Sequence, residues 1–251
     1  MIDGWTEWAL LAVAALCVGL GKAGFSGIGL ITVAIMAELF VEKSVGVLLP
    51  MLIIADLSVY PFFRKHGCWG PVWKLLPPAL VGIAVGYFVL QGLPQEAFKP
   101  LIGCLILLMV LVQFGRKCSE ARFDRFAHSR GFGLGAGVFA GFATMVANAA
   151  GPVFQLYLLS KRMPKMELIG IGARFFLLIN ILKLPLTAKL NFTTPESLLL
   201  NLKLAPLILI GVFFGKRLLS LISQRVFEWM VIGFAVLAGV RLITSAVFGS
   251  E

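Results

Sequence analysis

Two interruptions in an otherwise apolar sequence, the first of them rich in glycine, hold the residues best suited to bind a ligand. The first, Gly19 to Leu30, reads GLGKAGFSGIGL and combines five glycines with a lysine and a serine. The second, Ala147 to Pro152, reads ANAAGP. A helix that resumes after such a break presents free backbone N–H groups and a positive dipole end, which together attract anions. The pattern therefore predicts an anion-binding site formed by the two breaks.

Polar side chains near both breaks would complete such a site. A lysine supplies a full positive charge, and hydroxyl and amide groups supply hydrogen-bond donors for anionic oxygens. The alternative role for the glycines is close packing between helices, as in small-residue helix interfaces. The candidate substrate-binding residues are Lys22, Gly24, Ser26 and Gly27 from the first break and Thr144, Asn148 and Gly151 from the second.

Four further polar residues, Asp56, Arg174, Asn180 and Lys183, lie within apolar segments. Ionisable residues inside membrane spans are costly, so they usually serve function or are paired. Asp56 is expected either to take up a coupled proton or to balance the charge of Lys22 or Lys183. Lys183 lies close enough to the end of its segment for its ammonium group to reach the membrane surface instead. We predict that these four residues serve coupling or charge balance.

The composition places the whole chain in a membrane. Of its 251 residues 59% are hydrophobic and only 14% are charged, whereas a soluble domain is about 45–50% apolar. The sequence predicts an integral membrane protein, surrounded by lipid, with one bundle and no separate soluble domain. The net charge of +10 is spread over short loops, where it marks orientation and does not indicate a nucleic-acid partner.

Motifs for other chemistries are missing from the sequence. Lys22 follows a glycine but is followed by Ala23, so the stretch is not a nucleotide-binding phosphate loop. The two histidines, His66 and His128, both lie in basic loops and form no cluster with carboxylates. The four cysteines contain no C-x-x-C pair. We therefore expect no enzyme active site, no cofactor and no metal.

The apolar segments fall into two similar halves. Asn180 lies 124 positions after Asp56, and Gly151 lies 124 positions after Gly27. Such collinear matches indicate a duplication. Each half is predicted to hold one glycine-broken segment, either a re-entrant hairpin or a pair of half-helices, and three transmembrane helices. These helices are expected at 45–63, 72–90 and 100–114 in the first half and at 168–186, 202–214 and 226–247 in the second.

Basic loops indicate how the halves are oriented, because such loops stay in the cytoplasm. An odd number of crossings per half then inverts the second half relative to the first, which is a common design of secondary transporters. The two breaks would approach from opposite sides and meet near the membrane midplane, with both termini on the non-cytoplasmic side. The expected division is a first repeat at 1–115, a basic cytoplasmic linker at 116–130 and a second repeat at 131–251.

Three stretches, GLGKAGFSGIGLITV, ANAAGPVFQLYLLSKRMPK and FFLLINILKLPL, resemble the sulfite exporter TauE/SafE family, also called the 4-toluene sulfonate uptake permeases. Asp56 followed by Tyr60 and Arg64 is similar to the end of the third segment in many members. The resemblance covers nearly the whole chain. It implies two inverted repeats with central glycine motifs, transport of small sulfur-containing anions, and coupling to protons or to the electrochemical gradient. Arg174 departs from the family pattern, in which an uncharged, often aromatic residue is expected.

The sequence as a whole predicts a secondary transporter in the bacterial inner membrane. Its substrate would be sulfite or an organosulfonate, carried through a central site between inverted halves in the direction of export. One alternative is an anion channel without coupling. The other is an integral membrane enzyme, which the residues support less well. Export is implied by the family resemblance, and the residues themselves do not determine the direction, the coupling ion or the oligomeric state.

Overall fold

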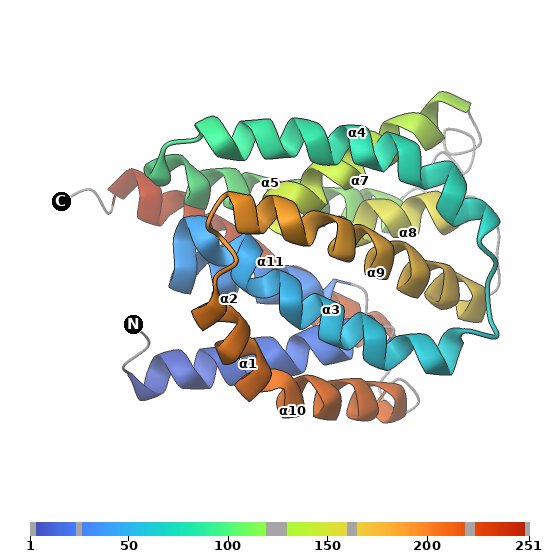
Figure 1. Ribbon diagram of the computed structural model, residues 1–251, viewed down its shortest axis with the longest axis horizontal. Helices are drawn as coiled ribbons and strands as arrows, with labels where there is room; N and C mark the ends of the chain where they lie inside the picture. The colour runs from blue at the N-terminus through green and yellow to red at the C-terminus, as the bar shows by residue number, and fades with distance from the viewer. Residues whose placement is uncertain (1–3, 24–26, 119–129, 160–164, 219–223, 249–251) are drawn as a thin grey trace.

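The protein is an elongated bundle of helices that run along its long axis (Figure 1). The computed structural model describes residues 4–23, 27–118, 130–159, 165–218 and 224–248, and every regular element in these ranges is helical. The first half contains α1 (Trp5–Lys22), α2 (Ile28–Phe40), α3 (Ser44–Phe63), α4 (Gly70–Gly92) and α5 (Phe98–Cys118). The second half contains α7 (Arg130–Ala147), α8 (Gly151–Leu159), α9 (Lys165–Lys189), α10 (Pro195–Leu218) and α11 (Gln224–Phe248).

The surface of the bundle is that of a membrane protein. Six segments within the described residues are long and apolar enough to cross a membrane. Large apolar side chains such as Phe88, Leu111 and Leu237 are exposed on the outside of the bundle, where lipid tails would surround them. The prediction of an all-α polytopic membrane protein is confirmed.

Both predicted breaks are present. The first separates α1 from α2, and the second separates α7 from α8. Gly27, at the start of α2, has a φ of 104°, and Asn148, just after α7, has a φ of 53°. Both values lie in the left-handed region, which glycine and asparagine adopt more readily than other residues. The first break is shorter than its glycine-rich sequence, because residues 19–22 still belong to α1.

The broken helices are packed closely against the spans of the opposite half. α1 lies along α10, and α7 lies along α4. A Cβ atom added to Gly82 of α4 would overlap the carbonyl oxygen of Val138 in α7, and one added to Gly211 of α10 would overlap that of Leu16 in α1. At these two glycines, one in each half, the structure shows the close helix packing that small residues allow.

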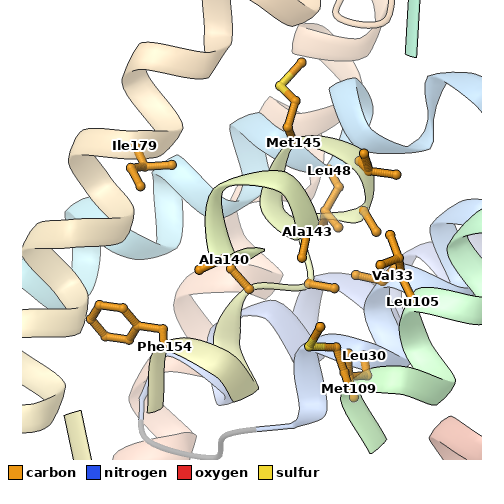
Figure 2. Packing of buried hydrophobic residues seen from close by; sticks show 14 of the residues in the cluster. Leu30, Val33, Leu48, Leu105, Met109, Ala140, Ala143, Met145, Phe154 and Ile179 are labelled. Carbon is orange, nitrogen blue, oxygen red and sulfur yellow. The ribbon is translucent and has the colours of Figure 1, made fainter. Parts of the chain in front are cut away.

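The core is apolar and surrounds the second break. Side chains of α2, α3, α5 and α7 meet there, among them Val33, Leu48, Leu105 and Met145 (Figure 2). The central helices α3 and α9 pack against each other, as do α5 and α11. α1 begins and α11 ends at one end of the long axis, whereas α3 ends and α9 begins at the other (Figure 1).

The start of α10 differs from the prediction. The expected span began at Leu202, but the helix begins at Pro195. Thr194 caps it, because the Ser197 N–H donates to Thr194 Oγ1 at 3.3 Å and the Thr194 N–H donates to Ser197 Oγ at 3.0 Å. This reciprocal pair, followed by proline in the first turn, is a recognised helix start. Residues 195–201, which lie before the expected span, form the first two turns of the helix.

Candidate functional site

A cavity of about 430 Å³ lies between the two breaks. Its lining includes residues from both broken helices and from α3 and α9. Gly24 and Ser26 lie outside the described residues, so the structure does not place them. The other predicted binding residues all line the cavity, namely Lys22, Gly27, Thr144, Asn148 and Gly151.

An ion pair forms the polar wall of the cavity at the first break. Lys22 Nζ, at the end of α1, lies 2.7 Å from Asp56 Oδ1 in the middle of α3. Asn180 Nδ2, on α9, donates to Asp56 Oδ2 at 2.8 Å. Asp56 and Asn180 are each 1% exposed, whereas the Lys22 side chain is 17% exposed. Of the partners considered for Asp56, the structure therefore shows Lys22.

Phe176 and Gln155 also line the cavity, and the sequence did not single them out. The ring of Phe176 lies beneath Lys22, with Nζ 4.6 Å from the ring centroid. Such a contact stabilises a cation in a site that is partly shielded from water. Gln155 belongs to α8. A glutamine inside a short apolar helix is a signal that sequence reasoning can use, whereas a phenylalanine in an apolar run is not.

Lys183 is buried at the second break. Its side chain is 0% exposed, so the alternative that its ammonium group reaches the membrane surface is wrong. Nζ donates to the backbone oxygen of Thr144 at 2.6 Å, to Thr144 Oγ1 at 3.0 Å and to Asn148 Oδ1 at 2.6 Å. Three acceptors match the three hydrogens of an ammonium group. Asn148 Nδ2 in turn donates to the Val45 carbonyl at 2.9 Å, so this network ties the break to α9 and α3.

The two breaks border the cavity at different depths. Lys22 meets α3 at Asp56, whereas Asn148 meets α3 at Val45. These two positions are eleven residues apart, or about 16 Å along a helix. Both breaks therefore border the same cavity, but at different levels along α3.

Arg174 lies apart from this site. Its guanidinium group donates to the carbonyl oxygens of Arg64 at 2.6 Å, His66 at 2.8 Å and Gly170 at 2.7 Å. It also lies 5.7 Å from the ring centroids of Tyr60 and Trp69. A cation is favourable at this position, because the carbonyl groups at a helix C-terminus carry partial negative charge. These contacts clamp the end of α3 to α9 and involve no cavity-lining side chain.

The family of the sulfite exporter TauE/SafE matches residues 11–242. The chain belongs to this family. No curated protein and no solved structure matches the chain significantly. Members of the TauE/SafE family are membrane transporters of sulfite-type anions, so the chain is a multi-pass membrane transporter of this class.

Proposed function

We propose that the TauE/SafE chain exports a small sulfur-containing oxyanion, sulfite or an organosulfonate, through the cavity between its two breaks. The observation that carries this proposal is the position of Lys22. It supplies the cation on the cavity lining, and part of its side chain is exposed to the cavity. The open helix starts at Gly27 and Gly151 border the same cavity, and both favour negative charge.

The ion pair supplies a mechanism for coupling. An anion that binds Lys22 competes with the carboxylate of Asp56 for the same ammonium group. A buried carboxylate without its cation is costly, so Asp56 takes up a proton as the anion binds. Anion binding and protonation of Asp56 are then linked, and Asn180 holds Asp56 in place through its remaining hydrogen bond.

The helix contacts support two inverted repeats, at 1–115 and 131–251. Exchanging the halves converts the α1–α10 contact into the α7–α4 contact and leaves the α3–α9 and α5–α11 contacts unchanged. A two-fold relation between halves has this property. The loop at 64–70 lies at one end of the bundle, opposite the two termini (Figure 1). The helix ends that border the other basic segments lie at the same end as this loop. We propose that this end is cytoplasmic in the bacterial inner membrane and that both termini are outside.

Flux of labelled sulfite into vesicles containing the purified protein tests the proposal. Lys22→Ala should lose about tenfold to a hundredfold in apparent affinity, because a charge-assisted hydrogen bond is lost. Lys22→Arg should keep part of the flux. The matched control is the double variant Lys22→Ala, Asp56→Asn, in which no buried carboxylate is left unpaired. Wild-type affinity in both alanine variants would refute the assignment of Lys22.

Asp56→Asn separates a coupled carrier from the alternatives. This variant should still bind the anion but should no longer respond to a pH gradient at clamped membrane potential. A wild-type protein whose flux ignores the pH gradient would instead be an uncoupled channel. A released product that differs chemically from the supplied anion would identify an enzyme.

A further inference from the structure

Three basic residues between α3 and α4 carry charges that the proposed function does not use. Arg64 and Lys65 follow the end of α3, Lys74 lies in the second turn of α4, and all three residues are exposed. Among the described residues no carboxylate forms an ion pair with this basic cluster. The sequence itself contains no aspartate or glutamate between Asp56 and Glu96. The basic cluster is therefore available to an anionic partner.

Two tryptophans place the basic cluster at the edge of the lipid-facing surface. The rings of Trp69 and Trp73 stack with their centroids 5.9 Å apart, and both residues are exposed. From Trp73 onward the exposed positions of α4 recur every three to four residues and are apolar, among them Leu80 and Phe88. Such a stripe faces lipid tails, and tryptophan is enriched where the tails meet the headgroups. Lys74 follows Trp73 directly, so its charge lies at the level of the headgroups.

Arg174 holds the backbone of this region in one arrangement. Its guanidinium group donates to the carbonyl oxygens of Arg64 and His66 at 2.6 and 2.8 Å, and it lies 5.7 Å from the ring centroid of Trp69. Neither Arg174 nor Glu167, the acidic residue of α9, forms an ion pair within the described part of the chain. The buried guanidinium group therefore adds positive charge beneath the loop. A surface that is already fixed loses little conformational entropy when a ligand binds.

We propose that the basic cluster binds the headgroup of an anionic phospholipid such as phosphatidylglycerol. The phosphate faces Arg64, Lys65 and Lys74, and the acyl chains lie along the exposed stripe of α4 beside the two tryptophan rings. Basic residues next to a membrane span attract anionic headgroups in this way. None of these residues lines the transport cavity, so the lipid site is separate from the anion site and does not depend on which anion is carried.

Native mass spectrometry of the purified full-length protein tests this proposal. The protein is titrated with phosphatidylglycerol or with phosphatidylcholine of the same acyl chains, and the two dissociation constants are compared. Phosphatidylglycerol should bind about tenfold more tightly. Lys74→Gln should lose about fivefold in affinity for phosphatidylglycerol and none for phosphatidylcholine. The matched control is Lys189→Gln, which removes an exposed lysine from the opposite end of α9 and should keep the wild-type preference.

Equal affinities for the two lipids in the wild-type protein would overturn the proposal. An equal loss in Lys74→Gln and Lys189→Gln would overturn it as well, because it would show a general attraction between a basic protein and an anionic lipid. Glycerol 3-phosphate, a headgroup without acyl chains, should displace phosphatidylglycerol only at a concentration about a hundredfold higher. Displacement at equal concentration would identify a site for a soluble phosphate instead. The wild-type comparison decides even where a variant does not fold.

Discussion

Two lysines stand beside the two breaks, and their surroundings differ. Lys22 borders the cavity and faces one carboxylate, whereas Lys183 is fully buried and donates only to neutral oxygens of the second break. An ammonium group whose three hydrogens are all in hydrogen bonds has no donor left for a ligand. A charged residue near a break can therefore bind substrate only if its hydrogen-bond donors remain available. Lys183 instead fixes the backbone that shapes the site.

The largest expected effect is the loss of stability in Lys183→Met. Methionine fills a similar volume but leaves the acceptors of Thr144 and Asn148 without their donor, which should cost about 3 kcal/mol. Thermal unfolding of the purified protein measures this loss. The double variant Lys22→Met, Asp56→Asn is the control, since it removes both members of a pair and should unfold close to the wild-type temperature. Equal melting of Lys183→Met and wild type would contradict a structural role for Lys183.

Gly82 packs against a neighbouring helix, whereas Gly29 lines the cavity, so alanine at these two positions should have different effects on stability. In Gly82→Ala the new Cβ would overlap the backbone of α7, and separating the two helices should cost about 2 kcal/mol. Gly29→Ala is the matched control, because no atom lies within 4 Å of its added Cβ. That variant should keep its stability or gain about 0.5 kcal/mol. If both variants have the same free energy of unfolding, close helix packing is not the reason for a glycine at position 82.

The smallest effect is expected at Arg174. In Arg174→Met the carbonyl oxygens of Arg64 and His66 lose their donor, but both residues are exposed at the end of α3 and neither lines the cavity. The expected loss is about 1 kcal/mol, with no change in anion affinity. Unfolding and binding measured on the same sample would check both statements. A tenfold loss of affinity would show that Arg174 belongs to the site after all.

Much of this arrangement follows from local sequence. The breaks and the polar residues inside the long spans stand out against an apolar background. Polar groups are costly inside a membrane, so they usually serve function or are paired. The match between Asp56 and Asn180, found as a spacing of 124 positions, corresponds to a direct hydrogen bond in the structure. The start of α10 was missed although its Thr194–Ser197 cap could have been found in the sequence.

Other features depend on contacts between distant segments. Lys183 meets Thr144 and Asn148 across more than thirty positions, and the partners of Arg174 on the α3–α4 loop lie more than a hundred positions away. Neither spacing has a local signature. The relative depth of the breaks depends on how far each broken helix slides along its neighbour, which hydrophobic pattern alone does not determine.

The most direct test of the central claim is to locate a bound anion. Selenite has the shape and charge of sulfite and scatters X-rays anomalously, so crystals grown with it would show its position. We expect one selenium peak inside the cavity, with a selenite oxygen about 2.7–3.2 Å from Lys22 Nζ. Bound selenite outside the cavity, or beside Lys183 with the Lys22–Asp56 pair intact, would contradict it.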